Sequence, residues 1–457
     1  MTNATSAEFR EAREASGPPN VSLLRVLRGY RPDPYERWTR IRVEHGPIAR
    51  YRFAFADSYL VTSAEGVKRV LQDNAANYTK EHPAYAMLRR LFGDGLLTSE
   101  GALWLRQRRL AQPAFHKERI AAMAESMTEA ALETSERLRA SASSGEPVSI
   151  LHEMSRLTLK VVGDALFGAS LGAKSALVQE AWNVMNAQLV ERFSKRRLLP
   201  PILPTAYDRA FRRSQRTLFS LVDAIIAERR GASSDDLLSM LMNARDADTG
   251  ERMTDAQLRD EIVTMLLAGH ETTAVALTWA WARLDLHRDV AARLHEELER
   301  VLGGRVPTAD DVPKLVYTRS VVEETLRLHP PAYIFQRRAK ADDVICGKRV
   351  HGGGNVVMSP LVLHRHPDYW DEPNAFRPER WADPEAQRRR PRFAYIPFSA
   401  GPRQCIGNAF SMMESVLVLA TLAQRFEPRL VASRLPEVEY LVLARPKGDV
   451  LARIETR

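Results

Sequence analysis

The alternation of apolar and polar residues along this chain predicts both strands and helices. Residues 48–62 alternate aromatic with basic side chains, a period of two that is typical of a half-buried strand. Residues 56–58, Ala-Asp-Ser, are expected to form the turn, so the region is predicted to be a β-hairpin. Residues 34–45 are predicted to form a short helix, and residues 64–73 carry apolar side chains at helical spacing.

The most clearly marked helix begins after Thr254. Thr254 and Gln257 have the spacing of a capping box, in which each side chain hydrogen-bonds the other residue's backbone N–H. The helix is expected to continue to about Leu286, a length of ~45 Å at 1.5 Å per residue, enough to cross a whole domain. A second helix is expected over residues 310–328, where a Pro-Pro pair ends it.

The composition changes after residue 332. Residues 332–400 are rich in Pro, Gly, Asp and His, with short strand-like pieces at 343–346 and 355–358. Long irregular segments are uncommon in compact domains unless they have a function. A final helix is predicted over residues 406–424 and a β-hairpin over 435–452. The sum is a mainly α protein with a minor β region.

The overall composition is that of an ordinary globular protein. The chain has 457 residues, 45% of them hydrophobic and 27% charged, enough to bury a large core around a bulky cofactor. We expect a flexible leader at residues 1–20 and a single domain over 21–457. Two cysteines, Cys346 and Cys405, give no disulfide framework and fit a reducing compartment. Since no apolar run is long enough to span a bilayer, we expect a soluble, cytoplasmic protein.

The charge balance favours an acidic partner. The formal net charge is +9, which suits nucleic acid, an anionic membrane or an acidic electron carrier. The basic residues form scattered patches with no basic stripe interleaved with aromatic side chains. This pattern argues against nucleic acid.

One cysteine lies in a loop of unusual composition. Residues 397–407 read Pro-Phe-Ser-Ala-Gly-Pro-Arg-Gln-Cys-Ile-Gly, and Cys405 stands just before a predicted helix. The N–H groups and the positive partial charge of a helix N-terminus favour a thiolate. Gly401 and Gly407 permit close approach of a flat ligand, and Arg403 could pair with an acidic group on it. From the residues alone, a buried structural cysteine remains equally open.

Three other motifs combine polar residues within predicted helices. Glu324 and Arg327 are three residues apart and can pair. Residues 268–273, Ala-Gly-His-Glu-Thr-Thr, interrupt the long apolar helix with a glycine that costs ~1 kcal/mol relative to alanine. Trp104 and Arg108 lie one turn apart and could together hold a carboxylate. Taken singly, each motif also fits a solvated helix face or a small-residue helix crossing.

Together the motifs resemble the cytochrome P450 family. Its haem-binding loop is matched position by position at Phe398, Gly401, Arg403, Cys405 and Gly407. The resemblance implies that Cys405 is the axial ligand of the iron in haem b (iron protoporphyrin IX), where thiolate ligation favours O–O cleavage. It also implies the P450 fold, a helix-rich triangular prism with a long central helix over the haem. Cys346 has no such context and is expected to be inert.

The resemblance gives the long helix a role in oxygen activation. Ala268 and Gly269 would let the helix pass close over the haem and leave room for dioxygen. Glu271 and Thr272 would hold water and deliver protons by relay, since a hydroxyl both donates and accepts hydrogen bonds. Family members that use peroxide or rearrange their substrates often lack this acid–threonine pair, so its presence favours a monooxygenase.

The remaining motifs are implied to bind the haem edge. Trp104 and Arg108 would hold a haem propionate. Arg338 matches another propionate-binding arginine, and the adjacent Arg337 is an alternative for the same role.

A further motif is implied to lock the fold. Residues 376–381, Phe-Arg-Pro-Glu-Arg-Trp, look like the family's meander. The resemblance implies that Arg380 joins Glu324 and Arg327 in a buried triad with no catalytic role.

The family resemblance also locates a substrate pocket. Its residues are mainly apolar, which suggests a hydrophobic substrate such as a fatty acid, a terpenoid or a steroid. The residues expected in it are Tyr85, Met87, Leu91, Phe92, Leu199, Ile202, Ala268, Thr272, Ala332 and Ile334.

The chain is most similar to free-standing bacterial members, with neither a membrane anchor nor a fused reductase expected. Such a protein would act as a monomer and take electrons from a separate ferredoxin or flavodoxin. The arginine run at 388–392 could steer an acidic carrier or simply be solvated. The alternatives are a haem-thiolate peroxygenase or isomerase, a non-catalytic haem protein such as a gas sensor, and a metal-free helical binding protein.

Overall fold

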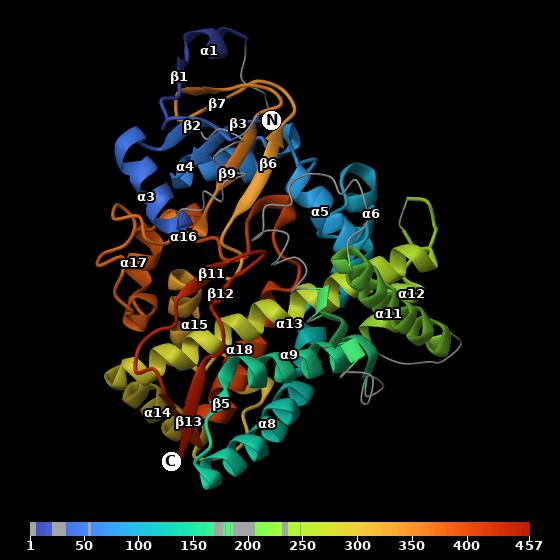
Figure 1. The fold of residues 1–457 in the computed structure, drawn as a ribbon, viewed down its shortest axis with the longest axis vertical. Helices are drawn as coiled ribbons and strands as arrows, with labels where there is room; N and C mark the ends of the chain where they lie inside the picture. Colours follow the sequence, from blue (N-terminus) through green and yellow to red (C-terminus); the bar gives the residue numbers. More distant parts are fainter. Residues whose placement is uncertain are drawn as a thin grey trace.

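The computed structural model describes residues 6–20, 33–53, 56–168, 177–178, 180–182, 184–185, 206–230, 236–246 and 248–457. The helices are α1 Ser6–Glu11, α3 Pro34–His45, α4 Ala64–Lys68, α5 Pro83–Phe92, α6 Gly101–Ala111, α7 Lys117–Ala122, α8 Ala124–Ser144, α9 Ile150–Phe167, α11 Ala206–Arg229, α12 Leu237–Asn243, α13 Asp255–Leu286, α14 Arg288–Leu302, α15 Val316–Leu328, α16 Pro360–Leu363, α17 Pro384–Arg389 and α18 Asn408–Ala423. The strands are β1 Arg13–Glu14, β2 Ile48–Phe53, β3 Ala56–Val61, β4 Tyr78–Thr79, β5 Val148–Ser149, β6 Phe335–Ala339, β7 Asp343–Ile345, β8 Lys348–Val350, β9 Asn355–Met358, β10 Phe426–Leu430, β11 Val438–Tyr440, β12 Ala444–Pro446 and β13 Leu451–Thr456. The prediction of a mainly α fold with a minor β region is confirmed (Figure 1).

Helix α13 runs through the middle of the molecule (Figure 1). The predicted capping box is confirmed, because the Thr254 N–H donates to Gln257 Oε1 at 3.0 Å and the Gln257 N–H donates to Thr254 Oγ1 at 3.3 Å. Most of its residues are buried, since α9, α11, α15 and α18 all pack against it. This explains why its apolar residues surround the helix instead of forming one stripe.

The first hairpin belongs to a five-stranded sheet of order β2-β3-β9-β6-β4. Strands β2 and β3 are antiparallel, as predicted, with Ile48 opposite Val61. The turn was expected at 56–58, and this prediction is wrong: these residues begin β3. Asp57 is fixed there because its carboxylate pairs across the strands with Arg50 at 3.1 Å and Arg52 at 3.3 Å.

The described part of the expected leader packs on the sheets. Strand β1 pairs in parallel with β8, with Arg13 opposite Lys348. The Arg50 N–H donates to Ser16 O at 2.9 Å, and Glu14 pairs with the Arg50 guanidinium at 2.9 Å. Residues 6–20 are therefore held by backbone and ionic contacts to the rest of the chain.

Two element boundaries predicted for the C-terminal part of the chain differ from those in the structure. Helix α15 begins at Val316, not near 310, because Thr308 and Asp311 close a separate 3₁₀ turn. The predicted hairpin at 435–452 is confirmed only in its centre, where β11 pairs with β12. Residues 451–456 instead form β13, which pairs with β10 and β5.

A buried charge cluster joins α15 to the segment that follows α16. The Glu324 carboxylate accepts two hydrogen bonds from Arg327, both at 2.8 Å, and one from Arg380 at 3.0 Å. Glu324 and Arg327 have no exposed side-chain surface. The three residues expected to form a triad are thus in direct contact.

None of the helices in the described part of the chain combines the length and apolarity that crossing a bilayer would require.

Candidate functional site

A cavity of about 520 Å³ lies beside α13, lined by residues from both halves of the chain. Most of the residues expected to bind the cofactor or act in catalysis line it. These are Trp104, Arg108, Ala268, Gly269, Glu271, Thr272, Phe398, Arg403, Cys405 and Gly407. The fold therefore gathers motifs that are up to about 300 residues apart into one chamber.

Cys405 faces this chamber from a loop that ends at α18. Its N–H donates to Phe398 O at 2.9 Å, which closes the loop. The loop crosses Leu71 so closely that a Cβ on Gly401, where φ is +70°, would lie 1.7 Å from Leu71 O. Gly401 is therefore needed for this crossing and does not itself line the cavity.

The electrostatic surroundings of the Cys405 thiol differ from the sequence-based expectation. Burial in the chamber raises the pKa of the thiol, and this outweighs the effects of the Gly407 N–H, Arg108 and Lys80, which lower it. The nearby donors and cations therefore favour the thiolate of Cys405, and its enclosure in the chamber opposes it.

Four cationic side chains line the same cavity: Lys80, Arg108, Arg337 and Arg403. Burial lowers the pKa of Arg403 to about 10, and burial together with Arg337 and Arg403 lowers the pKa of Lys80 well below its usual value. The only carboxylate among the described lining residues is Glu271. The chamber thus concentrates positive charge, which favours an anionic group inside it.

Each of these cations is held by a specific partner. The Arg403 guanidinium lies 3.9 Å from the centre of the Trp104 ring and pairs with Glu100 at 2.7 Å. Arg108 donates to Gln404 O at 3.0 Å, and Lys80 donates to Leu97 O at 2.8 Å. The positions of these charges are therefore set by the protein before any ligand binds.

Arg338 does not belong to this group. It is exposed and donates to Gly353 O at 3.3 Å, outside the cavity, whereas its neighbour Arg337 is buried and lines the cavity. Successive side chains of a strand point to opposite faces, so only one of the two can reach the chamber. The structure favours the alternative residue, Arg337.

The polar turn of α13 borders the cavity. Thr272 Oγ1 donates to Ala268 O at 2.7 Å, the carbonyl one turn earlier. Glu271 is buried, and Arg445 of β12 approaches its carboxylate to 4.0 Å. Gly269 also faces α9, where a Cβ would lie 3.2 Å from Val162 Cγ2. Gly269 therefore allows a close contact between α13 and α9 and also lines the cavity.

The predicted substrate residues divide according to their helix face. Tyr85, Phe92, Ala332 and Ile334 line the cavity with Ala268 and Thr272. Met87 and Leu91 lie one turn apart on α5 and pack in a core cluster without lining the cavity, whereas Tyr85, Leu88 and Phe92 of the same helix reach it. Leu199 and Ile202 lie outside the described residues.

Several lining residues were not predicted from the sequence. Val162 and Leu166 belong to α9, and residues 441–443 form the tip of the β11–β12 hairpin. The apolar tip of a predicted hairpin was an available signal for the last of these, because exposed turns are normally polar.

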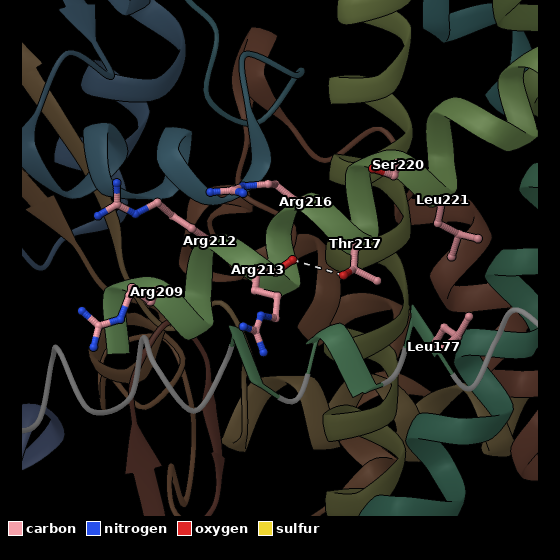
Figure 2. Close-up of a pocket in the computed structure, with 8 residues that line it drawn as sticks. All are labelled: Leu177, Arg209, Arg212, Arg213, Arg216, Thr217, Ser220 and Leu221. Carbon is pink, nitrogen blue, oxygen red and sulfur yellow. Dashed lines mark hydrogen bonds between the residues drawn. The ribbon is translucent and has the colours of Figure 1, made fainter. Parts of the chain in front are cut away.

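A second hollow lies along α11 (Figure 2). Arg209, Arg212, Arg213 and Arg216 line it, and Thr217 donates to Arg213 O at 3.1 Å. Its described lining contains neither a thiol nor a carboxylate. Of these two described linings, only that of the first cavity carries a thiol and a carboxylate.

The comparison with known protein families agrees with this geometry. A sequence model described as Cytochrome P450 matches residues 16–451. The chain belongs to the cytochrome P450 family. The family resemblance inferred from the motifs is thus confirmed, and P450 membership implies a haem cofactor, dioxygen as a substrate and a redox partner.

Individual P450 enzymes extend the match over most of the chain. Cyclooctatin synthase of Streptomyces melanosporofaciens is 39% identical, covering 84% of this chain and 83% of its own. Cyclooctat-9-en-7-ol 5-monooxygenase of the same organism is 35% identical, covering 85% and 83%. The crystal structure of the cytochrome P450DA heme domain superimposes with a TM-score of 0.86 and 27% identity over 97% of this chain and 98% of its own. The protein is therefore an oxidoreductase of the P450 monooxygenase class.

The side chains of this P450 chamber fit a haem. Cys405 supplies the one thiol among the described lining residues, and its side chain is accessible from the cavity. The excess of buried cations over carboxylates matches the two propionates that a haem carries. The chamber therefore supplies a sulfur donor for iron and positive charge for the haem edge.

Proposed function

We propose that this P450 inserts one oxygen atom of O2 into a C–H or C=C bond of a terpenoid. The observation that carries the proposal is one apolar chamber that holds Cys405 together with Glu271 and Thr272. Bound haem would supply the activation of dioxygen at its iron. The protein side chains would bind the haem, orient the substrate and deliver protons.

Haem b is the proposed cofactor, and the Cys405 thiolate would hold its iron. Trp104, Arg108 and Arg403 would hold its propionates, as the family resemblance implies. We assign the role expected of Arg338 to Arg337 instead, and we add Lys80 to the group. Arg337 and Lys80 both line the chamber. Phe398 and Gly407 would lie beside the sulfur, and Ala268 and Gly269 would leave room for dioxygen.

Arg337→Ala is expected to weaken haem retention. Loss of one charge-assisted hydrogen bond costs ~1.5–3 kcal/mol, so haem should transfer to an acceptor such as apomyoglobin roughly 10- to 100-fold faster. Arg338→Ala is the matched control, because the same charge is removed from the adjacent, outward position. Equal transfer rates in the two variants would refute the assignment of Arg337.

Thr272 and Glu271 are the proposed proton-delivering residues. The Thr272 hydroxyl donates to Ala268 O, and rotation about its Cα–Cβ bond would redirect this proton into the chamber. Glu271 lies next to it on α13, near Arg445. A buried carboxyl group beside a hydroxyl can pass protons inward by a relay.

Thr272→Ala is expected to uncouple electron consumption from oxygenation. Product formation should fall by roughly 10²-fold, while hydrogen peroxide takes a larger share of the electrons consumed. Both are measured against reductant oxidation in the presence of a redox partner. Thr278→Ala is the matched control, since Thr278 makes the same 2.7 Å bond to Ala274 O but does not line the cavity. Unchanged coupling in Thr272→Ala would remove Thr272 from the mechanism.

The terpenoid class is favoured over fatty acids and steroids by one relative. That enzyme is named for 5-monooxygenation of cyclooctat-9-en-7-ol, a cyclic alkenol. The chamber lining offers mainly apolar side chains to such a compound.

The test is turnover of cyclic terpenoid alcohols with ¹⁸O₂ and a redox partner. One labelled oxygen in the product would support the proposal. Oxygenation of fatty acids alone would overturn the substrate class, and turnover with peroxide but not with reductant would overturn the monooxygenase reaction.

A separate ferredoxin or flavodoxin is the proposed electron donor. The arginine run at 388–392 is mostly exposed, except that the Arg390 guanidinium lies 3.8 Å from the centre of the Trp370 ring. Arg388, Arg389 and Arg392 remain to attract an acidic carrier. The monomeric state and the cytoplasmic location stay predictions from the sequence.

A further inference from the structure

A short segment of the cavity wall lies directly on α13. Residues 93–97, Gly-Asp-Gly-Leu-Leu, connect α5 to α6. A Cβ on Gly93, where φ is +73°, would lie 2.2 Å from Asp260 Cγ, and a Cβ on Gly95 would lie 2.2 Å from Thr264 Oγ1. Only glycine permits this approach, so the segment is built for contact with α13.

Two adjacent carboxylates of α13 hold this segment. The Asp94 N–H donates to Asp260 Oδ2 at 2.8 Å, and the Leu96 N–H donates to Glu261 Oε2 at 3.0 Å. On the other side, Lys80 donates to Leu97 O at 2.8 Å. Leu96 and Leu97 line the cavity. The position of this wall therefore depends on ionisable groups.

Glu261 is the unusual member of the pair. It is completely buried, and its second oxygen, Oε1, has no hydrogen-bond partner among the described residues. Burial, opposed by the Leu96 N–H and assisted by the nearby Asp260, raises the pKa of Glu261 to about 8. A buried carboxyl group with one hydrogen bond and no cation is stable mainly in its neutral form.

The charges on the neighbouring elements are engaged elsewhere. On α13 itself, Arg259 lies 3.6 Å from Asp260 and 3.4 Å from Asp223 of α11. From α5, Arg89 pairs with Asp94 of the segment at 2.6 Å.

Helix α12, which also packs against α13, carries no ionisable side chain over Leu237–Asn243. Among the described ion pairs, none includes Glu261. Its charge state is therefore governed by burial, by the Leu96 N–H and by Asp260.

We propose that Glu261 is the positioning residue of a latch, which holds residues 93–97 against α13 while its carboxyl group is neutral and releases them when it is charged. Release would open this wall of the cavity to ligands. The latch itself rests on the geometry of the segment, and only its effect on ligand entry rests on the proposed haem function.

The direction of the pH effect follows from proton linkage. In the closed state the pKa of Glu261 is about 8, and its ordinary value is 4.5. Between these values the closed state keeps a proton that the open state loses, so the latch weakens as pH rises through this window. The open population should increase by at most about tenfold per pH unit and level off above pH 8.

The experiment compares wild-type holoprotein with Glu261→Gln. Hydrogen–deuterium exchange of peptides covering residues 93–97 is measured from pH 6 to 8, with exchange times scaled for the intrinsic chemistry. The binding rate of a phenyl-substituted 1,2,4-triazole, which stays neutral in this range, is measured in parallel. Wild-type exchange and binding should both accelerate at least about tenfold. Glu261→Gln should show neither change, because its amide oxygen still accepts the Leu96 N–H and cannot ionise.

The matched control is Glu297→Gln. Glu297 is also buried and accepts the N–H groups of Tyr317 and Thr318, neither of which lines the cavity. This variant should keep the wild-type pH profile at residues 93–97. A flat wild-type profile would overturn the latch without need of any variant, and an identical slope in wild type and Glu261→Gln would overturn the role of Glu261. If hydrogen–deuterium exchange followed the expected pH profile but the triazole caused no spectral change, the proposed haem function would be contradicted. The latch would still be supported.

Discussion

Cys405→Ser is expected to abolish the spectrum of a thiolate-bound haem. Wild-type protein, reduced and bound to carbon monoxide, should show the strongly red-shifted Soret band of an intact axial thiolate. The variant presents an alcohol at the same point of the chamber, which does not ionise at neutral pH and is a much poorer ligand for iron. Its Soret band should move to the ordinary position, and reductant-driven oxygenation should be lost.

The second cysteine gives this experiment its control. Cys346 lies in a different part of the fold, beside Ser63, with 3.2 Å between the sulfur and the hydroxyl oxygen. It does not line the cavity, so Cys346→Ser should keep the wild-type spectrum. A red-shifted band in Cys405→Ser would contradict the central assignment, because Cys346 is then the one thiol left in the 457-residue chain to bind the iron.

Local signals explain which parts of the fold could be predicted. The start of α13 is determined by Thr254 and Gln257, which are three residues apart, and the pair Glu324–Arg327 lies within one helical turn. The cysteine loop is likewise a continuous segment. Each of these features depends on residues that are close together in the sequence, and each is present in the structure.

Features that depend on the orientation of an element could not be predicted in the same way. A period of two shows that Arg337 and Arg338 face opposite sides of a strand, but not which side meets the cavity. Similarly, the spacing on α5 groups Met87 with Leu91 without indicating that this face packs in the core. Those assignments depend on contacts with distant segments.

Residues that act through long-range contacts left even less signal. Lys80 and Glu261 meet the cavity wall from elements about 180 residues apart in sequence, at Leu97 and Leu96 respectively. In the sequence, Glu261 is one of five acidic residues between 255 and 286, and no neighbouring residue distinguishes it from the others. Its burial, and therefore its altered pKa, follows from the packing of distant segments on α13, residues 93–97 among them.

Arg327→Ala is expected to prevent accumulation of stable, haem-loaded protein. Arg327 is fully buried and donates to both oxygens of Glu324 and to the backbone oxygens of His364, Pro373 and Ala375, all at 2.7–2.8 Å. Removing it leaves three carbonyl groups without this donor and a buried carboxylate with one remaining arginine. Breaking a buried pair costs ~3–5 kcal/mol, a large part of the ~5–15 kcal/mol that stabilises a typical domain.

The matched control lies on the same helix. Arg319 is 61% exposed and pairs with Glu323 at 3.6 Å across one turn, so Arg319→Ala should cost only ~0.3–0.5 kcal/mol. The two variants are compared by the yield of haem-loaded protein and by urea unfolding. Arg327→Lys separates charge from geometry, because a single ammonium group cannot reproduce a two-pronged hydrogen bond together with three carbonyl contacts. If it were as stable as wild type, charge alone would suffice. If Arg327→Ala lost no more than Arg319→Ala, the buried triad would not be what joins α15 to residues 364–380.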